Sequence, residues 1–270
     1  MRTNLKSAPA LALFACMLAW GDARAAAGTI GGDHRLVRRF VEDGAIVQKG
    51  WLEAAVGYDD GSRGRDLRSA LTLAFRLGPD VEAGVVLGGL DRRRDPGDRL
   101  YGPPLAAAVD ASGVGDAMLF GKVRVVRRPF DLALGASVEV PLADDEEGLG
   151  PGVAQYRAFV GLRTGSARAT VIGWIGAGRR GDSEFAGRAA GLNTLLAGAG
   201  VLVPVSRLWT FVAEADYEGA RFSGEQADGR ALAGLDWRPT DNLVVRGEAG
   251  AGLTGGAPDR MGSISFVFHF

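Results

Sequence analysis

The sequence predicts an all-β fold: a transmembrane, antiparallel, up-and-down β-barrel of about 12 strands, with short periplasmic turns and longer extracellular loops. Three observations predict it. The chain after residue 50 divides into twelve segments of strand length, apolar and charged side chains alternate within them, and the links between them are alternately short and long. In a membrane barrel the side chains alternate between lipid and lumen, and the links are short at one rim and long at the other.

The first 25 residues have the pattern of a secretory signal peptide. Arg2 and Lys6 precede an apolar stretch, residues 8–20, and small residues then lead up to Ala25. We therefore predict cleavage after Ala25. A lipoprotein site at Cys16 is the alternative, although a bulky side chain stands two residues before this cysteine and the apolar run continues beyond it.

The composition of the remaining chain excludes several classes of protein. Residues 1–25 hold three basic and one acidic side chain, so the 31 basic and 32 acidic residues of the whole chain become 28 and 31, a net charge of −3. That balance argues against nucleic-acid binding. Cys16 is the only cysteine, so the later chain offers no disulfide and no thiolate ligand, and we predict no metal and no cofactor. No apolar run reaches the roughly 18 residues that a transmembrane helix needs.

Residues 26–50 have no clear hydrophobic period, and we predict that they form a periplasmic lead-in to a barrel of residues 51–270. The links after residues 77, 126, 163, 203 and 238 are tight and rich in residues that favour turns. The other links are longer and polar, and they include residues 60–65 and 91–114. The strands that we predict are residues 51–59, 66–77, 81–90, 115–126, 130–140, 153–163, 167–178, 190–203, 209–219, 229–238, 242–253 and 261–270.

Alternation within the predicted strands separates charged from apolar side chains. In residues 66–77, for example, Arg68 and Arg76 fall on one face, whereas Leu71 and Phe75 fall on the other. The charged face is expected to point into the lumen, because a charge at the bilayer midplane costs about 2–4 kcal/mol. We predict that the lumen and any solute path are lined by Arg68, Arg76, Glu82, Lys122, Arg124, Glu139, Arg157, Arg168, Glu214, Asp216, Arg246 and Glu248.

These predicted lumen residues carry both signs of charge. The charges can pair across the lumen and fill it, or they can line a narrow water-filled path that selects small solutes. The sequence leaves both arrangements open. A soluble β-sandwich with one wet face would also alternate, but it has no reason to keep its links alternately short and long.

Aromatic side chains lie near the ends of the predicted strands. Such a distribution is typical of the two interfacial belts of a membrane protein. The belt at the short-turn rim would contain Phe75, Phe130, Trp209, Trp237 and Phe270, and the belt at the long-loop rim would contain Tyr58, Tyr156 and Tyr217.

The last predicted strand, residues 261–270, ends the chain on an aromatic residue. Phe266, Phe268 and Phe270 share one face, and Ser265 lies on the other. A soluble protein rarely leaves an apolar edge strand unpaired, whereas in a closed barrel this strand pairs with the first. The pattern resembles the signal that the barrel-assembly machinery of bacterial outer membranes reads, so we assign Phe266, Phe268 and Phe270 to that signal. We expect Ser265→Ala to be nearly silent.

Three groups of residues with possible chemistry remain, and we predict that the protein is not an enzyme. Nucleophilic hydrolysis needs a base beside a serine, but His34 precedes the predicted barrel and His269 is the penultimate residue. The acidic residues 144–147 form either a calcium site or a solvated loop. The arginines at residues 92–94 lie in the longest predicted loop, where they either meet lipopolysaccharide phosphates or are solvated.

Several local motifs resemble one known family. They are Gly50-Trp51-Leu52-Glu53 after the lead-in EDGAIVQKG, Gly113-Val114-Gly115-Asp116 with Gly121-Lys122, and the ending GLTGGAPDRMGSISFVFHF. Together they are similar to the meta-pathway of phenol degradation family of outer-membrane proteins, over roughly Arg39 to Phe270. The resemblance implies a bacterial outer-membrane barrel, sometimes linked to the uptake of aromatic compounds, and it implies no catalytic residue and no defined substrate.

Two functions therefore remain to be weighed. The first is a passive outer-membrane channel for small solutes, with aromatic or hydrophobic compounds suggested by the resemblance. The second is a structural or surface-interaction barrel with a charge-filled lumen and no transport. Either protein would have outer-membrane lipid, lipopolysaccharide and the barrel-assembly machinery as partners, and neither would bind nucleic acid.

Overall fold

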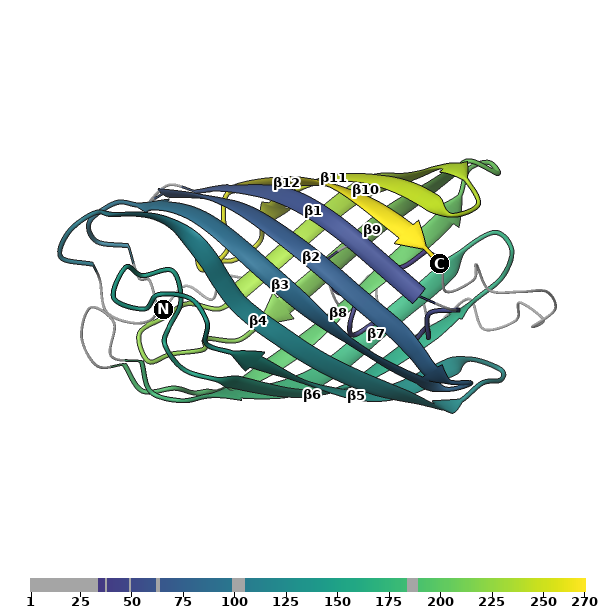
Figure 1. Ribbon diagram of the computed structural model, residues 1–270, viewed down its shortest axis with the longest axis horizontal. Helices are drawn as coiled ribbons and strands as arrows, with labels where there is room; N and C mark the ends of the chain where they lie inside the picture. The colour runs from purple at the N-terminus through teal and green to yellow at the C-terminus, as the bar shows by residue number, and fades with distance from the viewer. Residues whose placement is uncertain (1–33, 37, 49, 62–63, 99–104, 184–188) are drawn as a thin grey trace, which may run out of the picture.

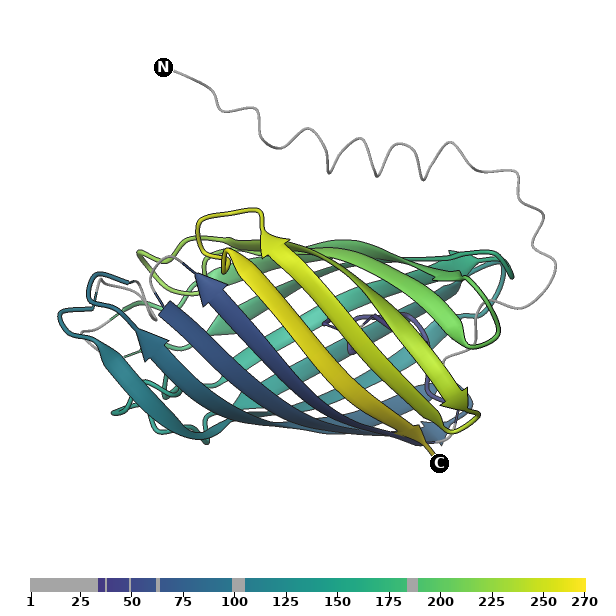
Figure 2. The same cartoon turned by 90° about the horizontal axis from the view of Figure 1, so that it is seen from above.

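A computed structural model describes residues 34–36, 38–48, 50–61, 64–98, 105–183 and 189–270. The predicted signal peptide lies outside these residues. In the described part, twelve antiparallel strands form one closed barrel, which confirms the predicted fold class (Figures 1 and 2). None of the described residues forms a helix long and apolar enough to cross a membrane. The strands are β1 (Gly50–Gly61), β2 (Gly64–Gly78), β3 (Val81–Arg94), β4 (Val109–Val126), β5 (Asp131–Val140), β6 (Gln155–Gly165), β7 (Thr170–Arg180), β8 (Asn193–Pro204), β9 (Trp209–Glu218), β10 (Asp228–Thr240), β11 (Leu243–Gly252) and β12 (Arg260–His269).

The last strand closes the barrel against the first. β12 pairs with β1 over ten residue pairs, from Trp51 opposite His269 to Asp60 opposite Arg260. The chain end continues the ladder, because the Gly50 amide donates to the Phe270 carbonyl oxygen at 2.8 Å. Closure leaves no strand edge exposed, which is the condition for a sheet to span hydrocarbon.

The links are short at the rim where the C-terminus lies. They comprise residues 79–80, 127–130, 166–169, 205–208 and 241–242, and this confirms the five tight links. At the opposite rim, five links run from 7 to 14 residues, but the first comprises only residues 62–63. β1 and β2 remain paired through Asp60 and Arg65. The prediction of a longer link at residues 60–65 was therefore wrong, and so was the strict alternation of link lengths.

The two faces of the strands are as predicted. Leu71, Phe75 and Ile175 keep 44%, 42% and 56% of their surface exposed on the outside, although all three are large and apolar. Trp209 and Trp237 are also exposed and stack with their rings 5.9 Å apart, as expected for the belt at the short-turn rim. Phe130 differs, because it lies in a turn and is half-buried.

Candidate functional site in the lumen

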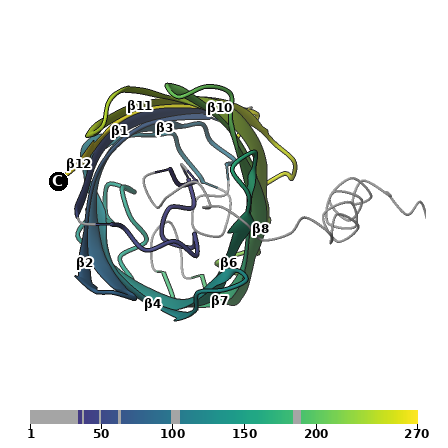
Figure 3. The ribbon, with the colours of Figure 1, turned by 90° about the vertical axis from the view of Figure 1, so that its right-hand side faces the viewer.

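The described residues before β1 lie inside the barrel. Residues 34–36 and 38–48, called the plug below, form the purple segment within the ring of strands in Figure 3. Their backbone makes one tight turn, in which the Asp43 amide donates to the Arg39 carbonyl at 3.2 Å. Only Arg38 and Gln48 of the plug are not buried. The prediction of a lead-in in front of the barrel is therefore corrected for these residues.

Inward-facing glycines make room for the plug on the barrel wall. A Cβ atom on Gly161 of β6 would stand 2.2 Å from the Glu42 carbonyl oxygen, and one on Gly44 would stand 3.1 Å from the Gly161 oxygen. On β8, a Cβ on Gly200 would meet the Leu36 side chain at 2.4 Å. The plug thus lies directly against the bare backbone of two strands, a typical use of glycine within a strand.

Apolar side chains of the plug complete the core of the lumen. The Phe40 ring packs 4.8 Å from the Trp51 ring and meets Phe120 edge-on at 6.0 Å. On the other side Leu36, which is fully buried, packs in a cluster with Ile172 and three other wall residues. These contacts exclude water from one level of the lumen.

Glu82 of β3 is the centre of one buried polar network at this level. Its carboxylate accepts two hydrogen bonds from the Arg35 guanidinium, at 2.9 and 2.6 Å, and one from the Val47 amide at 2.7 Å. The Lys122 ammonium lies 3.3 Å from the same carboxylate and donates to the Asp43 carbonyl at 2.7 Å. The side chains of Arg35, Glu82 and Lys122 are completely buried. The predicted lumen residues Glu82 and Lys122 therefore hold the plug.

A second buried network lies across the lumen. Arg163 of β6 binds the Asp43 carboxylate at 2.9 Å and the His34 carbonyl at 3.0 Å. The His34 ring lies 2.9 Å from Asp236, which also pairs with Arg246 at 3.0 Å. The first predicted alternative is thus realised at this level: the charges pair and fill the lumen, but they pair largely through the plug. Although His34 precedes the strands in the sequence, it consequently lies inside the lumen and not in a segment in front of the barrel.

The side chains fill the lumen less completely on the long-loop side of these networks. Asp216 of β9 binds Arg39 at 2.7 Å, and Glu214 accepts the Arg38 amide at 2.9 Å. The Arg38 and Arg68 side chains nevertheless remain 25% and 41% exposed inside the barrel. This level, called the outer chamber below, is therefore not filled by the described side chains.

The remaining predicted lumen residues divide into four groups. Glu139 pairs with Arg180 at 3.1 Å and Arg157 with Glu218 at 3.3 Å, both on the long-loop side of the lumen. Glu248 accepts a hydrogen bond from Ser263 of the neighbouring strand at 3.0 Å. Arg76 and Arg124 lie at the short-turn rim, where they contact the Gln48 carbonyl and Asp80. Arg168 is exposed in the turn of residues 166–169, because β7 begins only at Thr170, so its assignment to the lumen was wrong.

The arginines at residues 92–94 are not in a loop, as was predicted, but at the end of β3. Arg92 and Arg94 turn inward to the fully buried Asp66 of β2, at 3.3 and 2.5 Å. Arg93 alone points outward and is exposed. The acidic residues 144–147 are exposed, and the Asp144 side chain caps their turn by accepting the Glu147 amide at 3.1 Å.

The long loops pack together over the outer chamber. Leu105, Ala189 and Phe222 come from three different loops and form one buried cluster. The Arg180 guanidinium lies 5.7 Å from the centre of the Phe222 ring. The lumen is therefore narrowed at the long-loop rim as well as by the plug.

Asp80 at the short-turn rim provides a prediction about pH. Its hydrogen bonds with Arg127, at 2.6 and 2.5 Å, and then with Arg124 lower the pKa of this exposed carboxyl to about 2. A carboxyl with a depressed pKa stabilises the folded state fully above its ordinary pKa, near 3.8, and loses that effect as the pH falls through about 2. We expect carboxyl NMR signals of Asp80 to titrate near pH 2, and to return toward the ordinary range in Arg127→Gln. Titration near pH 4 in the wild-type barrel would contradict the contact.

The chain resembles solved outer-membrane barrels, while no family model and no curated protein matches it. It is similar to the COG4313 outer membrane channel from Pseudomonas putida F1, with a TM-score of 0.68 over 87% of this chain and 100% of that one, at 12% identity. The NanC porin gives a TM-score of 0.57 at 10% identity (81% and 100% covered), and the KdgM porin 0.54 at 11% (82% and 99%). These likenesses establish the fold. Membership of the phenol degradation family stays a prediction.

Proposed function

We propose that the protein is a passive channel for small solutes in the bacterial outer membrane, and that the described structure is its closed state. The fold is shared with an outer membrane channel and two porins. The predicted signal peptide is consistent with export through the inner membrane. By the family resemblance, aromatic or hydrophobic compounds are the first solutes to test.

One observation carries this proposal: the element that fills the narrow level of the lumen is not part of the wall. The plug is bound by side-chain contacts and short backbone approaches, whereas every described wall strand pairs with two neighbours. Removing the plug would therefore leave a closed barrel with an open lumen. Twelve strands enclose more space than an eight-stranded barrel, whose interior is filled by side chains alone.

The charge-locked lumen favours a second candidate, the structural or surface-interaction barrel. Arg35, Glu82, Asp43 and Arg163 have side chains at most 1% exposed, and each has a partner of opposite charge. At the level of the plug these ion pairs seal the lumen, so the charges there are explained by binding of the plug without any transport activity. We propose no enzymatic activity, since His34 is engaged by Asp236 and His269 packs edge-on against Trp51 at 4.9 Å.

Deleting residues 34–48 separates the two candidates. We expect the full chain to conduct weakly in planar bilayers, and the deleted barrel to conduct several-fold more and to swell liposomes in phenol or benzoate. Gel mobility before and after boiling checks that the deleted barrel is folded. A folded, deleted barrel that passes neither ions nor solute would rule out the channel and leave the structural barrel.

A further inference from the structure

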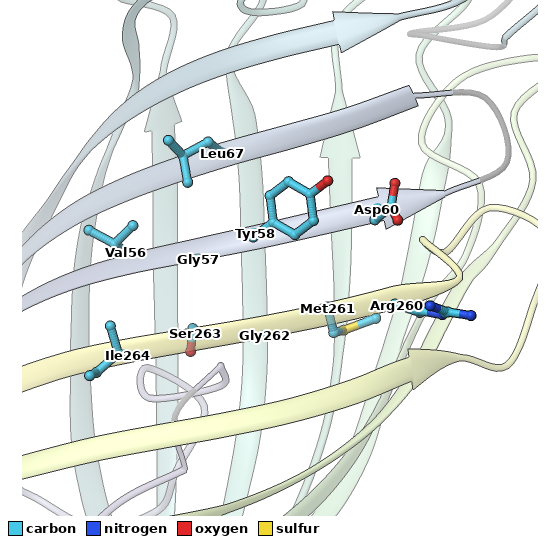
Figure 4. Close-up of a pocket in the computed structure, with 10 residues that line it drawn as sticks. All are labelled: Val56, Gly57, Tyr58, Asp60, Leu67, Arg260, Met261, Gly262, Ser263 and Ile264. Atoms are coloured by element: carbon cyan, nitrogen blue, oxygen red, sulfur yellow. The ribbon is translucent and has the colours of Figure 1, made fainter.

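The outer surface of the barrel has an apolar groove over β1 and its two neighbours, β2 and β12, near the long-loop rim. The groove measures about 500 Å³. Val56, Tyr58, Leu67 and Ile264 stand around it, each between 43% and 49% exposed. Figure 4 shows these side chains around the bare backbone of Gly57 and Gly262, which forms the floor. The groove faces away from the lumen, so lipid and not solute is the medium that reaches it.

Three arginines lie in a row above this groove, toward the long-loop rim. The ladder places Arg260 opposite Asp60, Asp60 opposite Arg65, and Arg65 opposite Arg93, across four adjacent strands. With about 4.8 Å between strands, the row spans roughly 15 Å. All three arginines are exposed.

The guanidinium groups of this row are available to an outside ligand. Asp60 and Asp110 lie in the same row and Asp91 lies one step below it, yet the side chains of Arg65, Arg93 and Arg260 make no ion pair or hydrogen bond within the described part of the chain. Arginine binds phosphate oxygens in a bidentate manner and is weakly hydrated, which suits it to phosphate at a membrane surface.

Along the membrane normal, the arginine row and the apolar groove lie in the order that suits an amphiphile. Tyr58 marks the level of the interfacial belt, the arginine row lies on its aqueous side, and the apolar groove extends toward the hydrocarbon. An amphiphile with phosphate groups above and acyl chains below would meet both at once. A free phosphate would use only the arginines, and a neutral lipid only the groove.

We propose that this surface binds a phosphate-bearing lipid of the outer leaflet, of the lipopolysaccharide class, with one acyl chain in the groove and its phosphates on Arg65, Arg93 and Arg260. The site rests on the membrane placement of the proposed function but not on conduction. It also replaces the predicted contact of residues 92–94, of which only Arg93 faces the lipid.

The test uses the full chain in phosphatidylcholine nanodiscs with added diphosphoryl lipid A, and native mass spectrometry to count bound lipid A. We expect the wild-type barrel to retain lipid A in preference to phosphatidylcholine. Replacing Arg65, Arg93 and Arg260 together by glutamine should weaken binding by about tenfold. Filling the groove by Gly262→Leu should weaken it as well, because Gly262 shares the outer face of β12 with Ile264 and a new Cβ there has no neighbour nearer than 3.4 Å.

Matched controls exclude general effects of charge and bulk. Arg128, Arg168 and Arg207 are exposed in turns at the opposite rim, and replacing all three by glutamine makes the same change in net charge. Gly173→Leu adds the same side chain on β7, where a Cβ meets only the Gly198 oxygen at 4.0 Å. Equal losses in the control and test variants, or no lipid A preference in the wild type, would overturn the proposal. Conductance of the same variants is expected to be unchanged, so failure of the channel would be seen separately.

Discussion

Glu82→Gln is expected to release the plug from the lumen. The change removes one charge and leaves Arg35 and Lys122, both completely buried, without their carboxylate. Removing one partner of a buried ion pair costs about 3–5 kcal/mol, because the other charge stays desolvated. The undocked plug becomes hydrated, so the equilibrium should shift toward the open barrel by at least a hundredfold. We expect larger single-channel conductance and rapid proteolysis of the N-terminal segment, while the strands remain protected.

Two further variants test this interpretation. Glu248→Gln is the matched control, because Glu248 also faces the lumen but accepts its hydrogen bond from Ser263 of the wall. It should leave conductance and proteolysis unchanged. Gly161→Leu displaces the plug by a steric route, since even its Cβ would overlap the Glu42 carbonyl. If Glu82→Gln and Gly161→Leu both fold with a protected N-terminal segment, the plug is a permanent part of the barrel.

The barrel could be predicted from the sequence because its determinants are local. The two-residue period of a strand is set by the backbone, so the faces of Arg68 and Leu71 can be predicted without knowing which residues they contact. The predictions failed where strands continue beyond the hydrocarbon. Arg92 and Arg94 belong to β3, and they were taken for loop residues because polarity was read as a sign of a loop. Outside the bilayer a strand needs no apolar face, so its ladder can continue on charged residues.

The plug could not be predicted in the same way. Its backbone has no period, and its partners are remote: 202 residues separate His34 from Asp236, and 120 separate Asp43 from Arg163. One weak signal was present, since Gly161 is a strand glycine with the same inward parity as Arg157, and such a glycine often marks the close approach of another backbone. Most of the predicted lumen residues lie on the inward face, because that face follows from the same two-residue period, but the residues that they contact could not be predicted.

Replacing Phe266, Phe268 and Phe270 by serine is expected to block insertion into the outer membrane. The three rings are 46–53% exposed on the outer surface, and Phe270 also packs edge-on against Phe75 at 6.0 Å. Each substitution removes about 1.5–3 kcal/mol of apolar burial in lipid. The backbone hydrogen bonds between Gly50 and residue 270 remain, so strand pairing is kept. We therefore expect the substitutions to impair recognition by the assembly machinery and to slow insertion. We expect loss of the heat-modifiable band from the membrane fraction and degradation in the periplasm.

The control variant must remove a similar amount of apolar contact with lipid, but from strands other than the C-terminal one. Leu119, Ile175 and Leu195 are 50%, 56% and 53% exposed on β4, β7 and β8, and serine at all three costs similar contact with lipid. Ser265→Ala, which was expected to be silent, is unsuitable because the fully buried Ser265 hydroxyl donates to Glu53 at 2.6 Å. If the final strand is the assembly signal, the terminal triple variant should insert far less than the control triple. Equal insertion would assign the effect to lost lipid contact, since both variants lose similar apolar contact and only the terminal one changes the final strand.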